Sequence, residues 1–144
     1  MLRDRSLIPL SHEHQHALGM CVLVQRALLG DGSEENLARQ REVILAMWNG
    51  EIREHFAVEE SVVFPVLEDY PGAAALVEEL AREHAGMRGL FAELEAGADR
   101  ETMDRLCVML SEHVRKEERA LFEQIQQLLT REQLDALGER LGVT

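Results

Sequence analysis

Two copies of one short pattern constrain this chain more than any other feature of its sequence. Residues 55–64 and residues 113–122 both read His-x-x-x-Glu-Glu-x-x-hydrophobic-Phe. Both stretches lie in segments whose apolar residues recur with the period of an α-helix. Residues four apart share one face of a helix, so each histidine points the same way as the first glutamate that follows it.

The two His/Glu pairs fall on the apolar face of their helices. Around His55 and Glu59 the stripe contains Ile44, Leu45, Trp48, Ile52, Val62 and Val66, and around His113 and Glu117 it contains Leu106, Leu110, Leu121 and Leu128. A carboxylate buried without a partner carries a large free-energy cost or becomes neutral. Glu59 and Glu117 therefore need something positive between them, and one or two divalent metal ions would meet that need.

The composition favours a single all-α domain over residues 1–144. Hydrophobic residues make up 46% of the chain but aromatic residues only 4%, and there are only 3 prolines, so helix formers dominate. No segment alternates between apolar and polar residues over the length of a strand. The formal charge of −12 lacks the basic surface of a protein that binds nucleic acid or anionic membranes, so we expect neither as a partner.

The compartment is expected to be the cytoplasm. The first residues, Met-Leu-Arg-Asp-Arg-Ser, lack the apolar core of a signal peptide, and no apolar run approaches the ~18 residues of a membrane span. Cys21 and Cys107 each lie in or beside a helical stripe, which favours reduced, buried thiols. The alternative for these two residues is a disulfide between helices.

Turn signals divide the chain into four long helices and one short one. Because short loops join antiparallel neighbours, we expect an up-down-up-down four-helix bundle over about residues 8–129, followed by a short C-terminal helix at about 130–141. The long helices are expected at about residues 11–29, 34–67, 73–96 and 100–129.

Four capping signals and one proline mark the ends of these helices. Ser11, Ser33 and Asp99 are candidate N-caps of the first, second and fourth helices, and Thr130 to Gln133 forms a capping-box pattern for the short helix. Pro65 removes a backbone donor, so the second helix should kink or break there.

The other histidines supply the remaining candidates for a metal site. His84 is the only histidine in the third helix and lies in the middle of its apolar stripe. His14 follows the stripe of the first helix, although His16 is a close rival and His12 shares a face with His16. The converging set is His14, His55, Glu59, His84, His113 and Glu117.

Four imidazoles and two carboxylates suffice for two metal ions. Each ion would take two histidines and both carboxylates would bridge, with a hydroxide or oxide offsetting the surplus positive charge. Mixed nitrogen and oxygen ligands suit iron, manganese or zinc, whereas structural zinc more often takes thiolates. Open coordination positions would remain for a small molecule such as oxygen.

From about residue 8 to 129 the sequence resembles the hemerythrin-like, or HHE cation-binding, domain family. The carrying motifs are Glu13-His14, His55 to Pro65, Glu83-His84 and His113 to Phe122, in that order. The resemblance implies a four-helix bundle around a non-haem di-iron centre. Two iron ions are therefore the expected cofactor, with zinc and manganese as less favoured alternatives.

The resemblance is closer to bacterial members with four histidines and two glutamates than to the oxygen carriers. Oxygen carriers have a further histidine four residues after the one in helix three, where this chain has Arg88. Their last carboxylate follows its histidine by five residues, a position held here by Glu118 instead of Glu117. Bacterial members are associated with sensing or handling oxygen, nitric oxide, peroxide or iron.

Three functions follow as hypotheses. The first is a di-iron protein that binds, senses or buffers a small reactive ligand (oxygen, nitric oxide or peroxide) or iron. The second is a redox enzyme that consumes peroxide or nitric oxide at the same centre. The third is a metal-free helical interaction module. Glu60 and Glu118, displaced by about 100° from the binding face, are expected to be solvated, and the alternative is that they orient a ligand histidine.

Overall fold

The computed structural model describes residues 2–97 and 99–143, and these residues form an all-helical protein. No strand occurs within the described residues, which confirms the expected all-α class. None of the described helices combines the length and apolar character needed to cross a membrane. The α-helices are α1 (Ile8–Gly30), α2 (Glu34–Met47), α3 (Arg53–Val58), α4 (Pro71–Ala96), α5 (Arg100–Lys116), α6 (Phe122–Leu128) and α7 (Arg131–Arg140).

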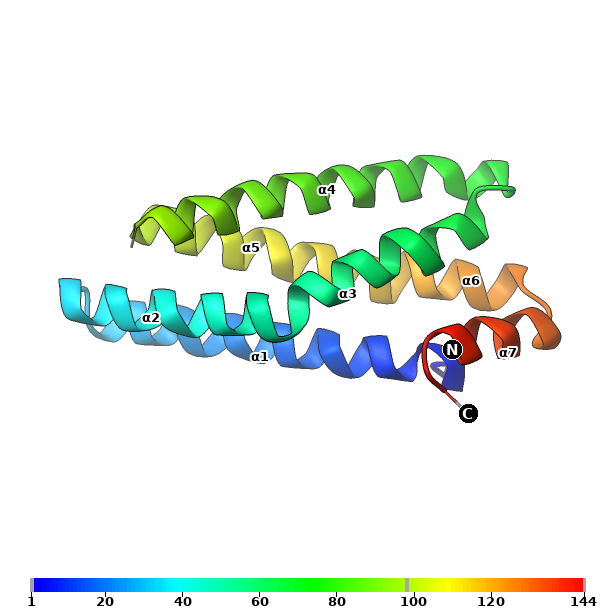
Figure 1. Ribbon diagram of the computed structural model, residues 1–144, viewed down its shortest axis with the longest axis horizontal. Helices are drawn as coiled ribbons and strands as arrows, with labels where there is room; N and C mark the ends of the chain where they lie inside the picture. The colour runs from blue at the N-terminus through cyan, green and yellow to red at the C-terminus, as the bar shows by residue number, and fades with distance from the viewer. Residues whose placement is uncertain (1, 98, 144) are drawn as a thin grey trace.

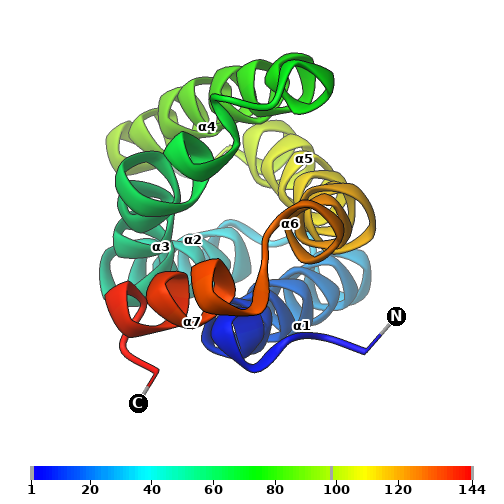
Figure 2. The same ribbon diagram turned by 90° about the vertical axis from the view of Figure 1, so that its right-hand side faces the viewer.

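The long helices lie side by side (Figure 1 and Figure 2). Figure 1 shows α2 and α3 along one line and α5 and α6 along another, with α1 and α4 completing the set. Helix α1 packs against α2 and α5, and α4 packs against α5. Figure 2, which views one end, shows α7 lying across that end beside the start of the chain. There α7 contacts the 3₁₀ turn Arg5–Leu7 that precedes α1.

Three of the four expected caps are present. The side chain of Ser33 accepts a hydrogen bond from the backbone N–H of Asn36, and that of Asp99 accepts one from Glu101. Thr130 forms the expected capping box at the start of α7. The prediction for Ser11 was wrong, because α1 already begins at Ile8. The Ser11 hydroxyl instead donates to Glu118, so tertiary structure gives this residue a different partner.

The second helix was expected to kink or break at Pro65 and the fourth to run unbroken over about residues 100–129, but both are interrupted at further places. Wider π turns interrupt them at Trp48–Ile52, Glu59–Val63 and Glu117–Leu121. A 3₁₀ turn at Phe64–Leu67 contains Pro65, where a kink or break was expected. A π turn takes in one residue more than an α turn and so rotates the side chains that follow it, an effect that an averaged apolar period conceals. Glu59 and Glu117 are each the first residue of such a turn.

Two apolar clusters fill the interior. One is built mainly from α1, α2, α4 and α5 and contains the stacked rings of Trp48 and Phe91, whose centroids are 4.1 Å apart. The other lies toward the termini and includes Phe64, Phe122 and, from α7, Leu137. The six candidate site residues belong to neither cluster but contact rings of both, since Phe56 and Phe64 each pack on His84.

Candidate metal centre

The structure brings all six sequence-predicted site residues together in the protein interior. None of the six is more than 5% exposed, and Glu59, His84 and Glu117 are fully buried. They come from every line of helices: His14 from α1, His55 from α3, Glu59 from the π turn after α3, His84 from α4, His113 from α5 and Glu117 from the π turn after α5.

The six residues form two overlapping groups of potential metal ligands. One group is His14, His55, Glu59 and Glu117, and the other is Glu59, His84, His113 and Glu117. Within each group, one ligand atom from each residue lies within 4.8 Å of all the others. Two histidines are particular to each group and both carboxylates are shared. Each group could therefore hold a metal ion.

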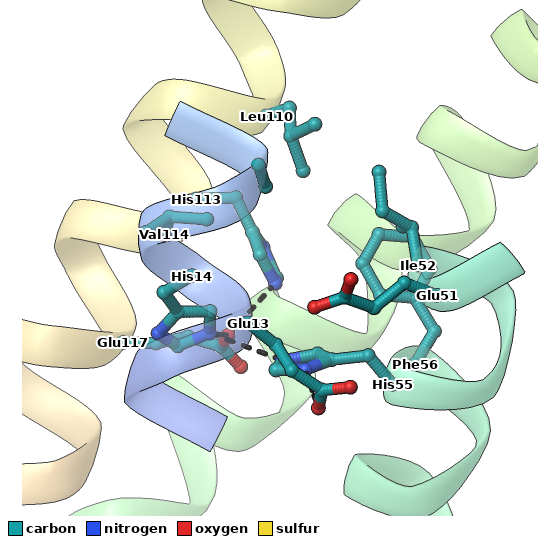
Figure 3. A pocket seen from close by; sticks show the side chains of 11 residues that line it. Glu13, His14, Glu51, Ile52, His55, Phe56, Leu110, His113, Val114 and Glu117 are labelled. Carbon is teal, nitrogen blue, oxygen red and sulfur yellow. Dashed lines mark hydrogen bonds and ion pairs between the residues drawn. The ribbon is translucent and has the colours of Figure 1, made fainter. Parts of the chain in front are cut away.

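The histidines of each group face one another through their Nε2 atoms. The Nε2 atoms of His14 and His55 are 3.1 Å apart, as are those of His84 and His113. The carboxylates lie equally close: His14 Nε2 is 2.9 Å from Glu117, and His84 Nε2 is 3.1 Å from Glu59. In Figure 3 the rings of His14, His55 and His113 converge on Glu117.

Each of the four histidines also contacts a glutamate through its outer nitrogen, Nδ1. The partners are Glu118 for His14 (2.5 Å), Glu13 for His55 (2.9 Å), Glu60 for His84 (2.7 Å) and Glu83 for His113 (2.7 Å). A carboxylate at Nδ1 holds the ring in place and directs Nε2 toward the interior. All four Nε2 atoms therefore face the space beside Glu59 and Glu117, where a cation would bind.

The outer carboxylates correct one expectation and extend another. Glu60 and Glu118 were expected to be solvated, but their side chains are only 35% and 28% exposed and both bind a histidine. Their contacts agree with the alternative expectation, in which Glu60 and Glu118 each orient a ligand histidine. Glu13 and Glu83 were noted only as neighbours of His14 and His84 in the sequence. Each contacts a histidine on a different helix, which local periodicity does not reveal.

The two shared carboxylates have oxygens without hydrogen-bond partners. Glu59 Oε2 and Glu117 Oε2 are both buried, and no described group forms a hydrogen bond with either. Burial and the neighbouring charge of Glu117 raise the pKa of Glu59 well above its usual range. Buried polar atoms in native proteins nearly always have a partner, so a positively charged ligand would satisfy these two oxygens. The residues therefore fit a bound metal.

The pKa values of His113 and His84 also indicate that the centre favours one positive charge. Burial disfavours the charged form of His113, but Glu117 and Glu83 outweigh it and raise the pKa of His113 to about 10. Burial and the adjacent His113 lower the pKa of His84 to about 4. The pKa values of the two rings thus differ widely, because a positive charge on His113 disfavours a second one on His84, whose Nε2 atom is 3.1 Å away.

A small pocket lies beside the centre, and Figure 3 shows the residues that line it. Its lining combines His14, His55, His113 and Glu117 with apolar residues such as Ile52 and with the carboxylates of Glu13 and Glu51.

The rival histidines of α1 lie outside the centre. His12 is exposed, and His16 is 59% exposed, with its Nδ1 2.8 Å from Glu51. His14, at 3% exposure, is the histidine of α1 that reaches the interior. Cys21 and Cys107 are free and buried, as expected, and neither belongs to the two ligand groups.

These features define an all-α protein with a buried histidine–carboxylate site that could hold metal. A family model for the hemerythrin HHE cation binding domain matches residues 9–125. The chain belongs to the hemerythrin HHE cation-binding domain family. A search of curated proteins gave no match, and neither did a search of solved structures.

Proposed function

We propose that this protein is a non-haem di-iron protein that binds, senses or buffers a small reactive ligand or iron. His14 and His55 would hold one ion, His84 and His113 the other, and Glu59 and Glu117 would bridge them. The observation that carries the proposal is the pair of overlapping, buried ligand groups in which each shared carboxylate has one oxygen without a hydrogen-bond partner. Cation binding by the family supports it independently.

The donor set supports iron or manganese over structural zinc. Each group offers two imidazoles and two carboxylates and no thiolate, a combination that suits iron or manganese and is unusual for structural zinc. Bound iron would supply redox chemistry and open coordination positions. The protein's own residues direct the histidine Nε2 atoms inward and keep bulk water away from the centre.

The pocket supports a small ligand. Its small size and its apolar lining residues, such as Ile52, suit oxygen, nitric oxide or peroxide better than a larger organic substrate. The proposed framework is a single up-down-up-down four-helix bundle with a short C-terminal helix. The two buried free thiols support a reducing compartment, the cytoplasm.

Metal analysis of the purified protein, combined with optical spectra, tests this proposal. We expect about two irons per chain and near-ultraviolet bands that bleach on reduction and return on reoxidation. Glu59→Ala and Glu117→Ala should each lower the bound iron sharply. No stoichiometric metal after anaerobic reconstitution with ferrous iron would refute the proposal and favour a metal-free helical module.

Steady-state consumption of the ligand separates binding from catalysis. A binding or sensing protein should take up peroxide or nitric oxide once per centre, whereas an enzyme would consume many equivalents per iron.

A further inference from the structure

The four outer carboxylates differ in what holds them in place. Glu60 and Glu83, which contact His84 and His113, each bind a cationic side chain as well. Glu118, which contacts His14, accepts a hydrogen bond from Ser11 at 2.8 Å and lies 3.3 Å from Arg3. No lysine or arginine among the described residues pairs with Glu13, the partner of His55.

Arg88 holds Glu60 with both arms of its guanidinium group. Arg88 donates a hydrogen bond of 2.7 Å to Oε2 and one of 3.0 Å to Oε1 of Glu60, and the same Oε2 lies 2.7 Å from Nδ1 of His84. The guanidinium also lies 5.7 Å from the ring centroid of Phe56, whose ring stacks on His84 at 3.9 Å. Arg88 therefore restrains His84 both through the carboxylate and through the stacked ring.

Lys116 performs the corresponding role beside His113. Its ammonium group donates to Glu83, the partner of His113 Nδ1, and also to Glu79 at 2.8 Å. Because Lys116 directly precedes Glu117 in the chain, it fixes the outer carboxylate from the same segment that supplies a shared ligand. His84 and His113 are also the least exposed histidines, at 0% and 1%.

The outer carboxylate beside His55 is held less firmly than those beside His84 and His113. Glu13, the partner of His55, is no more exposed at the side chain than Glu60 (34% against 35%), but no lysine or arginine among the described residues holds it. His55 and Glu13 line the pocket, together with His14 and His113. On its Nδ1 side, the orientation of the His55 ring thus depends on one carboxylate that has no such cationic partner.

We propose that Arg88 and Lys116 are positioning residues that make His84 and His113 the more tightly held half of the centre. This inference rests on the proposed function. A histidine whose ring is already fixed loses less freedom when it binds a metal, and it releases that metal more slowly. Metal held by His84 and His113 therefore outlasts metal held by His14 and His55.

Release of iron to an excess of strong chelator tests this inference on the metal-loaded full chain. We expect two phases in the unmodified protein, one for each half. Arg88→Gln should speed the slow phase by about 10-fold, the lower end of the usual effect of groups that orient metal ligands, and leave the fast phase within about two-fold. Arg88→Lys should recover part of the difference, since an ammonium group supplies charge but not the paired hydrogen bonds.

Two further variants sharpen the comparison. Glu13→Gln should speed only the fast phase. Arg39→Gln is the matched control, because the Arg39 side chain is 60% exposed and its one ion pair within residues 2–97 and 99–143 is with Glu35, a neighbour on α2. Its release kinetics should equal those of the unmodified protein. The Mössbauer spectrum should contain two quadrupole doublets, and Arg88→Gln should shift one of them alone.

The outcomes distinguish this inference from the proposed function. If the unmodified protein binds about two irons but releases them in one phase, or if Arg88→Gln changes both phases equally or neither, the inference is wrong while the di-iron proposal stands. If the unmodified protein binds no stoichiometric iron, both are wrong. An unchanged thermal midpoint of the metal-free Arg88→Gln protein, together with an accelerated slow phase, would exclude a general loss of stability as the cause.

Discussion

The carboxylate of Glu118 lies 2.5 Å from Nδ1 of His14, on the side of the ring that faces away from the centre. Glu117, the preceding residue, lies 2.9 Å from Nε2 of the same ring. Two adjacent glutamates therefore contact opposite nitrogens of one histidine, and this arrangement separates a ligand role from an orienting role.

Substitutions at these two positions should have different effects. Glu117→Ala removes a shared ligand, so we expect the iron content to fall sharply. Glu118→Gln keeps a hydrogen-bonding group beside His14 but removes the charge, so we expect unchanged stoichiometry with affinity lowered about 10–100-fold. Iron analysis and competition with a chelator measure the two quantities. Full iron in Glu117→Ala and loss in Glu118→Gln would reverse the assignment.

Glu59→Gln should have opposite effects on the metal-free and metal-loaded proteins. Without metal, Glu59 is a buried acid beside Glu117, and the neutral amide relieves a charge–burial conflict. We expect the metal-free variant to be more stable by about 1–3 kcal/mol. With metal, the variant loses a ligand and should be less stable than the unmodified protein.

Thermal and urea unfolding with and without a chelator check this reversal. Saturating metal at about 1,000 times its dissociation constant should stabilise the unmodified protein by about 4 kcal/mol. Adding chelator should lower the free energy of unfolding of Glu59→Gln much less than that of the unmodified protein. Equal responses in the two proteins would argue against Glu59 as a ligand.

The ion pair of Asp4 and Arg131 should make stability depend on acid pH. Two hydrogen bonds of 2.5 and 3.0 Å join these side chains, and the Arg131 guanidinium holds the pKa of Asp4 well below its usual range. A lowered pKa in the folded state stabilises the protein at pH values above the unfolded value of about 3.9. The contribution is lost as the pH falls below that value toward the pKa of the folded state.

Asp4→Asn should therefore cost about 1 kcal/mol at neutral pH and progressively less below about pH 4. Urea unfolding of the metal-free protein at several pH values measures the difference. Glu35→Gln is the control, because the Glu35 side chain is 89% exposed. A cost for Asp4→Asn that does not change with pH would contradict the expectation.

Alanine substitutions at two glycines, Gly138 and Gly19, should change the stability of the protein in opposite directions. A Cβ atom added at Gly138 in α7 would lie 3.1 Å from Cβ and 3.3 Å from Cα of Ser6, whose backbone cannot easily retreat. Gly138→Ala should destabilise the protein by about 1–3 kcal/mol by forcing α7 from the start of the chain. A Cβ at Gly19, within α1, meets nothing within 4 Å, so Gly19→Ala should stabilise by about 0.5–1 kcal/mol. Urea midpoints of both variants check the signs.

Local patterns in the sequence revealed much of the site. The four-residue spacing of His55 and Glu59, and of His113 and Glu117, placed each pair on one helical face, and the apolar neighbours placed that face inward. The same reasoning singled out His84. It left His14 and His16 as close rivals, because periodicity over one helix cannot decide which of two neighbouring faces meets the other helices.

The outer contacts were beyond this reasoning for a different reason. Glu13 and Glu83 contact histidines 42 and 30 positions away, and no local spacing encodes such a pair. The π turns were missed as well, although Glu59 and Glu117 begin two of them. A wider turn shifts only a few side chains and leaves the overall helical period almost unchanged.

The sequence by itself determined the all-α class, most helix caps and the six inward-facing histidines and glutamates, because each depends on neighbours within one or two turns. Tertiary structure alone decided that Glu118, Glu13, Glu60 and Glu83 take the outer nitrogens of the four histidines. It also decided that Arg88 binds Glu60 outside the six-residue cluster. These contacts join different helices, so they exist only after packing has set the rotation and height of each helix against the others.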